Sequence, residues 1–307
     1  MKFSLSTNWC NRRLDDAAAI VDEALSLGFD ALELGYRTDE PQAKAFSELA
    51  SRIKISSVHA FCPVPISAPC AHPELYSLAS VDREERSLAV LMTKRSIETA
   101  AETGADTLVM HAGRVLFSSF LSPLDTQALK AALIDAGGDI RDRRYMKKLS
   151  LARKRRSSRA AAVFDAFRAS FSELIPCLEK NSVTLALENL PYLEACPDEG
   201  EIMSLLAQFE GAPLASWFDT GHHAIRCRCG WVRPGGNFAA AIPHRGLHLN
   251  DVEGINDDHF EPGGGNVDFA ALKPLAQKAK HIVFEPSAGV SRDALAAALE
   301  RIKTLWK

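Results

Sequence analysis

Four short apolar segments in the second half of the chain each end on a carboxylate or an imidazole. The clearest covers residues 216–219, where Ser, Trp and Phe lead into Asp219 and a Thr-Gly pair follows. The other three segments end at Glu188, His248 and Glu285. A short apolar run closed by a turn signal predicts a buried strand. Because a TIM barrel collects the carboxyl ends of its parallel strands around one axis, this repetition predicts a barrel.

Strand-like and helix-like segments alternate along the whole chain. Predicted strands cover residues 2–7, 29–35, 53–60, 106–111, 183–188, 216–219, 245–249 and 281–285. Predicted helices lie between them, and Gly28 ends the first helix in the manner of a C-cap. Eight such units indicate parallel βα repeats and exclude a sandwich or a helical bundle. We therefore expect an α/β protein with a TIM (β/α)8 barrel that forms one domain over residues 1–307.

The alternation is interrupted after the fourth strand, between about residues 114 and 158. This insertion and its border are basic, with Arg141, Arg143, Arg144, Lys147, Lys148, Arg153, Lys154, Arg155, Arg156 and Arg159. Such a surface could bind a phosphorylated ligand, an acidic partner or RNA. Tyr145 is the only aromatic residue interleaved among these cations, so base stacking is not favoured. We expect a solvated helical insertion above the barrel mouth, followed by a helix over residues 159–180.

Charge and termini narrow the class of protein. A net charge of -3 and a pI near 6.3 give no bulk attraction to nucleic acid. Residues 1–6 lead directly into the first strand, without an apolar run that would make a signal peptide or a membrane span, so we expect a cytoplasmic protein. The 7 cysteines are scattered and do not indicate a disulfide framework. The oligomeric state stays open, with a homo-oligomer among the options.

Acids and imidazoles gather at the predicted carboxyl ends of the strands. In chain order these residues are Glu33, His59, His111, Glu188, Asp219, His248 and Glu285. Grouped carboxylates repel one another unless protons or a cation neutralise them. One divalent metal ion is the simplest neutraliser, and this mostly oxygen ligand set suits Mn²⁺, Mg²⁺ or Co²⁺ at least as well as Zn²⁺.

Several short motifs carry a resemblance to a known family. They are Val58-His59-Ala60, Met110-His111-Ala112-Gly113, Leu187-Glu188-Asn189, Phe218-Asp219-Thr220-Gly221-His222, His248-Leu249-Asn250-Asp251, Asp257-Asp258-His259 and Phe284-Glu285. Together they resemble the xylose isomerase-like TIM barrels, a superfamily of sugar and sugar phosphate isomerases and epimerases that also contains endonuclease IV. The resemblance covers the chain outside the insertion.

The epimerase branch of this family implies roles for individual residues. The implied metal ligands are Glu188, Asp219, His248 and Glu285. The candidate substrate contacts are His59, His111, His222, His259, Trp9 and Glu33. An arginine that this branch often places six residues after the strand-seven histidine is Gly254 here, so another residue must supply its contact.

The chemistry expected of such a site is proton transfer on a small-molecule sugar. A metal that holds the carbonyl and adjacent hydroxyl of a keto-sugar stabilises the enediolate formed when the neighbouring C–H loses its proton. Glu188 and Glu285, from strands on opposite sides of the barrel, would be the acid–base pair of an isomerase or epimerase. The same machinery could expel a β-hydroxyl or glycosidic oxygen, which makes a keto-sugar lyase or dehydratase an alternative.

A second alternative is a phosphodiesterase with three zinc ions that is similar to endonuclease IV. The nine ligands of that family all have counterparts, because His59, His111, His222, Asp257 and His259 add to the four implied metal ligands. We rank this alternative second for two reasons. Sugar isomerases of the superfamily retain many of these positions as substrate contacts, and the acidic pI argues against a surface that wraps DNA.

Overall fold

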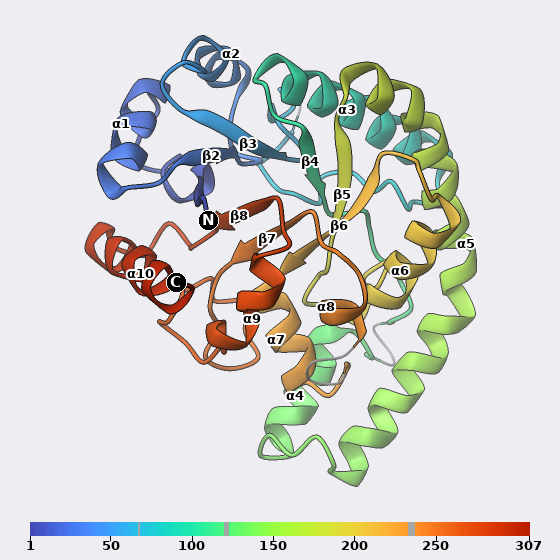
Figure 1. Cartoon of the computed structure of the whole chain (residues 1–307). Coiled ribbons are helices and arrows are strands. Elements are labelled where there is room, and N and C mark those ends of the chain that lie inside the picture. Colours follow the sequence, from blue (N-terminus) through green and yellow to red (C-terminus); the bar gives the residue numbers. More distant parts are fainter. Residues whose placement is uncertain (67, 120–122, 233–236) are drawn as a thin grey trace.

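Eight parallel strands close into a barrel in the computed structural model of the chain, which describes residues 1–66, 68–119, 123–232 and 237–307 (Figure 1). The strands are β1 (Ser4–Ser6), β2 (Ala31–Leu34), β3 (Lys54–His59), β4 (Thr107–Met110), β5 (Thr184–Glu188), β6 (Leu214–Asp219), β7 (Gly246–Leu249) and β8 (His281–Phe284). Each strand pairs with its neighbour in sequence, and β8 pairs with β1. The predicted TIM (β/α)8 barrel is confirmed.

Helices surround this ring of strands (Figure 1). They are α1 (Ala17–Leu27), α2 (Glu40–Glu48), α3 (Arg83–Glu102), α4 (Thr126–Asp135), α5 (Arg143–Asn181), α6 (Glu199–Gln208), α7 (Thr220–Arg228), α8 (Asn237–Ala241), α9 (Phe269–Ala276) and α10 (Arg292–Leu305), with a short 3-10 helix η1 (Thr7–Trp9) after β1. Gly28 ends α1 with a left-handed φ of 87°, as the C-cap prediction requires. None of the described helices is long and apolar enough to cross a membrane.

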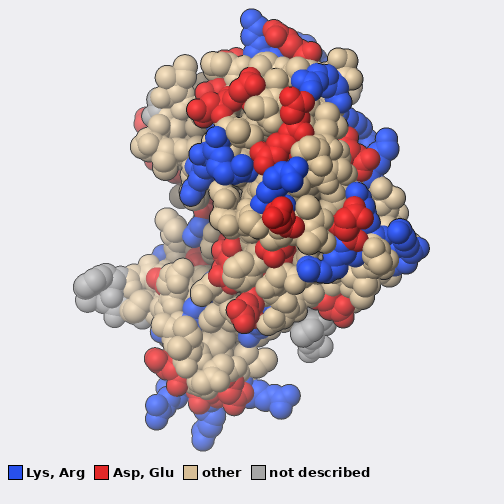
Figure 2. Space-filling model, turned by 90° about the vertical axis from the view of Figure 1, so that its left-hand side faces the viewer, with Lys and Arg blue, Asp and Glu red and all other residues tan. Residues whose placement is uncertain are grey.

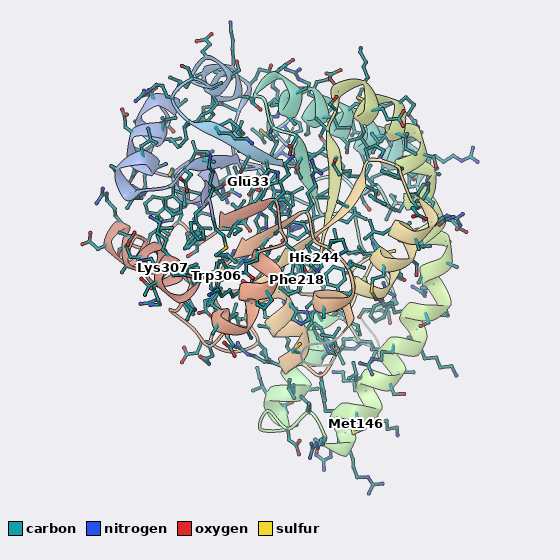
Figure 3. The ribbon with its side chains drawn as sticks, viewed as in Figure 1. Glu33, Met146, Phe218, His244, Trp306 and Lys307 are labelled. Atoms are coloured by element: carbon teal, nitrogen blue, oxygen red, sulfur yellow. The ribbon has the colours of Figure 1, made fainter. Side chains whose placement is uncertain are left out.

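The alternation of side chains along each strand delivers the polar strand ends to the interior. Val109, Ala186, Trp217 and Val283 form one buried apolar cluster from four different strands. Because successive side chains of a strand point to opposite faces, a residue two positions later shares their direction. Asp219 therefore points inward above Trp217, whereas Phe218 between them packs outward against His244, with ring centroids 5.2 Å apart. Phe218 and His244 are labelled in Figure 3. The core thus supports a polar layer at the carboxyl ends.

The segment between β4 and β5 differs from the prediction. The helix expected to begin at residue 159 is the second half of α5, one helix of 39 residues that already begins at Arg143. Its first half carries the basic residues, and Figure 1 shows it projecting with α4 beyond the barrel. Arg, Lys, Leu and Ala all favour helix, and neither Gly nor Pro occurs before Pro176 to end it. The basic segment is therefore helical, as expected, but it is continuous with the helix that was predicted to begin at residue 159.

One side of this projection packs on the barrel. Val115, Leu129 and Leu149 belong to a second apolar cluster that also contains Ile225 and Trp231 from the segment around α7. The Tyr145 hydroxyl donates to the Cys229 carbonyl at 2.6 Å and accepts from the Trp231 indole at 3.2 Å. Tyr145, the aromatic residue of the basic segment, is thus a buried packing residue.

The other side of the projection presents charges of both signs. Figure 2 shows Lys and Arg side chains at the lower end of the molecule beside Asp and Glu side chains. The exposed residues there include Arg143, Arg144 and Lys147, with Asp135 and Asp139 at the adjoining end of α4. This mixture makes a weaker anion-binding surface than the basic residues alone would predict.

Arg156 is an exception within the basic run because its side chain is only 9% exposed. Its guanidinium lies 2.7 Å from Glu201 and 3.3 Å from Asp198, and it also donates to the Ala195 carbonyl. Asp198 and Glu201 form the capping box of α6. Arg156 therefore joins α5 to the amino terminus of α6.

We expect Arg156→Met to lower the free energy of unfolding by roughly 1–3 kcal/mol, because two carboxylates and a carbonyl lose their partner. Lys154 is exposed and lies two residues before Arg156 on the same helix. Lys154→Met should therefore change the free energy of unfolding by less than about 0.5 kcal/mol. Denaturant midpoints of the two variants and the parent measure the difference. Equal midpoints for both variants would contradict the structural role of Arg156.

Candidate metal centre

A cavity of about 240 Å³ opens at the carboxyl ends of the strands. Its lining contains six of the predicted site residues: His59, His111, Glu188, His222, His259 and Glu285. The remaining polar residues of the wall come from the βα loops and are Tyr36, His72, Glu74, Tyr192 and Asp257. A larger cavity of about 700 Å³ lies outside the barrel between α7, α8 and α9 and contains none of the strand-end acids. The smaller cavity is therefore the candidate site, because it contains acids and imidazoles of the strand ends.

The centre of the site is a group of four buried residues from four strands. One ligand atom each from Glu188, Asp219, His248 and Glu285 lies within 4.8 Å of the other three. Glu188 and Asp219 end β5 and β6, His248 lies in β7, and Glu285 follows β8 directly. The structure thus brings together the four residues that the resemblance implied as metal ligands.

Asp219 is held by the helix that follows it. Its Oδ1 caps α7 by accepting from the His222 backbone N–H at 2.7 Å, and its Oδ2 accepts from the Asn250 side chain at 2.6 Å. A Cβ on Gly221 would collide with that Asn250 side chain. The Thr-Gly pair that predicted a break in the chain is therefore the start of a helix, and its glycine makes room for the residue that orients Asp219.

His248 presents an unpaired nitrogen to the centre of this group. Its Nε2 donates to Glu33 at 3.0 Å, which leaves Nδ1 with a lone pair. That Nδ1 lies 3.1 Å from Glu285 and 3.4 Å from Glu188. Within the described residues, neither His248 Nδ1 nor Glu188 Oε1 has a hydrogen-bond partner of acceptable geometry. A lone pair facing carboxylates is repulsive unless a proton or a cation lies between them, so the four residues fit a divalent ion.

Two residues predicted as substrate contacts do not line the cavity. Glu33 is fully buried and accepts from Ser57 at 2.8 Å as well as from His248, so it orients an imidazole and does not line the cavity. Trp9 is also fully buried, and its indole donates to the Val290 carbonyl at 2.8 Å. Neither side chain is among those that line the cavity, so direct contact of Glu33 or Trp9 with a substrate stays a prediction.

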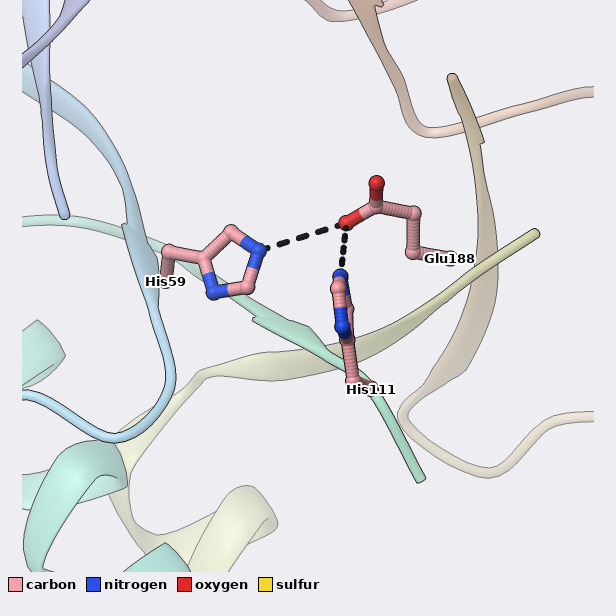
Figure 4. A group of neighbouring side chains, drawn as sticks. All are labelled: His59, His111 and Glu188. Atoms are coloured by element: carbon pink, nitrogen blue, oxygen red, sulfur yellow. Dashed lines mark hydrogen bonds and ion pairs between the residues drawn. The ribbon is translucent and has the colours of Figure 1, made fainter. Parts of the chain in front are cut away.

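A second group shares Glu188 with the first (Figure 4). The Nε2 atoms of His59 and His111 lie 3.3 Å and 3.2 Å from the same Glu188 oxygen, Oε2. His59 Nδ1 donates to the Ala60 carbonyl at 2.9 Å, which turns its Nε2 lone pair toward Glu188. Ligands about 2.0–2.1 Å from a tetrahedral zinc ion lie roughly 3.3 Å apart, so these spacings are compatible with a metal ion as well as with hydrogen bonds.

A third group lies at the rim of the cavity. His222 Nε2 and His259 Nε2 lie 3.5 Å and 3.4 Å from Asp257 Oδ1. Each of the two histidines donates its Nδ1–H to a backbone carbonyl at 2.9 Å, that of Asn189 for His222 and that of Glu285 for His259. The Asp257 side chain is 31% exposed, so this group is more accessible than the first two.

Burial and charge act against each other at these groups. Burial alone would raise the pKa of Glu188, but the surrounding imidazoles, His248 and His111 above all, hold that pKa well below its usual range. Burial would lower the pKa of His248, and Glu285, Glu33 and Glu188 instead raise it well above the usual value. Protons on the imidazoles thus neutralise the carboxylates, and a divalent ion would displace those protons.

Two tyrosines of the cavity wall, Tyr36 and Tyr192, belong to none of the sequence motifs. Tyr36 follows β2 by two residues and packs edge-on against His59, with ring centroids 5.6 Å apart. Tyr192 lies after β5 under the Arg114 guanidinium, which is 3.8 Å from its ring and bonded to Glu74 at 3.1 Å. The one signal in the sequence that could have indicated a place at the site is that both tyrosines follow strand ends, because loop residues show no periodic apolar pattern.

Comparison with known proteins shows the family. The family model described as xylose isomerase-like TIM barrel matches residues 21–305, which confirms the resemblance carried by the sequence motifs. A search of curated proteins finds no match to the chain. Among solved structures, a D-tagatose 3-epimerase-like protein is 21% identical, with a TM-score of 0.63 over 99% of this chain and 97% of that chain.

Two further solved structures are similar in fold. D-psicose 3-epimerase in the presence of D-fructose is 13% identical, with a TM-score of 0.62 over 100% of this chain and 99% of that chain. The IOLI protein with a zinc atom bound is 12% identical, with a TM-score of 0.66 over 100% of this chain and 98% of that chain. At these identities the likeness establishes the fold alone.

We expect Glu33→Gln to weaken binding of a divalent metal about 10- to 100-fold, because a neutral amide leaves the His248 imidazole less basic. Glu48→Gln, on the exposed end of α2, is the matched control and should bind metal as the parent does. Competition with a chromogenic chelator measures both affinities, and circular dichroism checks that each variant is folded. A Glu33→Gln variant with parental affinity would show that Glu33 does not act through His248.

Proposed function

Because the chain belongs to the xylose isomerase-like TIM barrel family, we propose that it is a divalent-metal-dependent epimerase or isomerase of a keto-sugar. The observation that carries this proposal is the four-residue group of Glu188, Asp219, His248 and Glu285 at the inner end of a sugar-sized cavity. Two of the three solved structures described above have names of keto-sugar epimerases or epimerase-like proteins, which supports the same class.

The four residues of this group would hold the metal. When bound, Mn²⁺, Mg²⁺, Co²⁺ or Zn²⁺ supplies positive charge that stabilises the oxygens of the enediolate of the substrate. All four side chains are buried or nearly so, and Asp219 and His248 are each held by a second residue, Asn250 or Glu33. The chain thus orients the ligands before a substrate arrives.

Glu188 and Glu285 are the residues placed to move the proton. They come from β5 and from the end of β8, and both line the cavity. Imidazoles hold the pKa of Glu188 well below its usual range, so this carboxylate is ionised at neutral pH and can accept a proton. For inversion of a carbon, one carboxyl begins ionised and removes the proton from one face, and the other begins protonated and returns a proton to the opposite face.

The reaction is tested by solvent exchange. In deuterated water the metal-loaded protein should replace one C–H proton of a keto-sugar substrate, followed by NMR over a panel of hexuloses and pentuloses. Glu188→Gln and Glu285→Gln should each lower the exchange rate by about 10²- to 10⁴-fold with little change in binding, because each removes a proton-transfer step. Glu253→Gln, at an exposed position, is the matched control. Equal exchange by all variants would refute the assignment.

The second and third groups support a second candidate function. His59 and His111 with Glu188, and His222 and His259 with Asp257, are spaced as ligands of two further ions. A centre of three metal ions suits hydrolysis of a phosphodiester, since several cations can stabilise the attacking and leaving oxygens together. This candidate is the phosphodiesterase similar to endonuclease IV.

Metal content and a DNA substrate separate the two candidates. The epimerase predicts one ion per chain by elemental analysis and no cleavage of a DNA duplex that carries an abasic site. The phosphodiesterase predicts three zinc ions per chain, chelator-sensitive cleavage of that duplex, and loss of one ion in His259→Ala. Three ions and cleavage, without proton exchange on any sugar, would replace the first proposal by the second.

A further inference from the structure

Beside the candidate metal centre lies a second cavity of about 250 Å³, whose lining includes Arg12 and Arg37. The two cavities share Tyr36, Asp257, His259 and Glu285 as lining residues. A ligand whose reacting carbon lies at Glu285 can therefore extend from the first cavity into the second. What occupies the second cavity determines which substrates the site can select.

The two arginines come from two neighbouring βα loops. Arg12 lies between η1 and α1, and Arg37 lies between β2 and α2. Other arginines at the carboxyl-end face are paired with acids, for example Arg13 with Glu23 at 3.4 Å and Arg114 with Glu74 at 3.1 Å. In the described part of the chain, no carboxylate lies within ion-pair distance of Arg12 or Arg37. Their charges are therefore available to a ligand.

The acids of this second cavity are mostly committed to imidazoles. Asp257 contacts His222 and His259, and Glu285 contacts His248. Asp258 is the one acid of the lining without such a contact among the described residues, and two guanidiniums outnumber it. The cavity edge is thus electropositive once the acids have their imidazole or metal partners.

Tyr36 links the arginines to the candidate metal centre. The Arg37 guanidinium lies over the Tyr36 ring at 5.5 Å, and the Tyr36 ring packs against His59. Burial, followed by Glu285, raises the pKa of Tyr36, and both Arg37 and Arg12 act in the opposite direction. Both guanidiniums are therefore within electrostatic reach of one hydroxyl that borders both cavities.

The geometry points to a phosphate subsite in which Arg12 and Arg37 bind the phosphate group of a keto-sugar phosphate whose sugar occupies the candidate metal centre. This inference rests on the proposed function and names its substrate class. A phosphate monoester carries about -1.5 to -2 charges at pH 7 and matches two guanidiniums, whereas one arginine satisfies a carboxylate. Residues 286–289, in the loop after β8, form the facing wall, and loops after the last strands commonly bind phosphate in TIM barrels.

The test compares a phosphorylated with a neutral ketose. Calorimetric titration of the metal-loaded protein uses D-fructose 6-phosphate and D-fructose as probes. The phosphorylated probe should bind at least about tenfold more tightly, and the double variant Arg12→Met/Arg37→Met should lose roughly 10- to 100-fold of that affinity while D-fructose binding is unchanged. Arg13→Met is the matched control, because Arg13 neighbours Arg12 but lies over Trp9 at 4.4 Å.

Three outcomes would overturn the phosphate subsite. The first is an unchanged preference for the phosphorylated probe in the double variant, since the phosphate would then bind elsewhere, for example at the metal. The second is an equal loss of affinity for both probes. The third is equally tight binding of D-fructuronate, which carries a carboxylate at the same carbon. Binding needs no turnover, so loss of phosphate recognition without proton exchange on any sugar would retain the subsite and reject the epimerase.

Discussion

Buried negative charge at the mouth of the barrel is the constraint on which the other features of the site depend. Glu33, Glu188 and Asp219 are each at most 3% exposed. A buried carboxylate without a partner costs several kcal/mol, so each must face a cation, a proton or several donors. The site supplies imidazoles for this purpose, and hydrogen bonds to carbonyls or to Glu33 turn each of His59, His222 and His248 in a defined direction. The imidazole lone pairs consequently converge where a cation is most stabilising.

The regular alternation of strand-like and helix-like segments, with turn residues between them, explains why so much of the fold could be predicted from the sequence. Each strand is a short apolar run, and the residue that ends it lies at the barrel mouth because all eight strands are parallel. The helical character of the basic segment was predicted, but its continuity with the helix after it was not, because the sequence does not distinguish one long helix from two shorter ones. Tertiary contacts decide between them. Tyr145 and Leu149 pack on the barrel and Arg156 binds the start of α6, so the helix continues through the charged run.

The convergence of strand ends on a closed barrel brought seven polar residues together, and the family resemblance named four of them as candidate metal ligands. Glu33 occupies an equivalent position, yet its side chain lies beneath the cavity. The register between β2 and β3 shifts at Leu32 and Glu33, and the Glu33 carboxylate bonds to His248 inside the barrel. No sequence pattern signals that shift. Trp9 lies in the 3-10 helix after β1, and its ring is buried in the core.

Chemistry and recognition are built from different parts of this chain. Strand ends, which the barrel holds rigidly, carry the proposed proton transfer at Glu188 and Glu285, whereas the loops after β1, β2 and β8 carry the proposed phosphate contacts. Loops can change without altering the strand register, so substrate class can vary while the reaction stays the same. The same separation explains why the basic segment of α5 has no role in the proposed recognition. Its cations either pack against the barrel or lie among acids on a projection, whereas Arg12 and Arg37 lie at the cavity. The position of a positive charge relative to the reacting carbon therefore decides recognition more than the number of charges does.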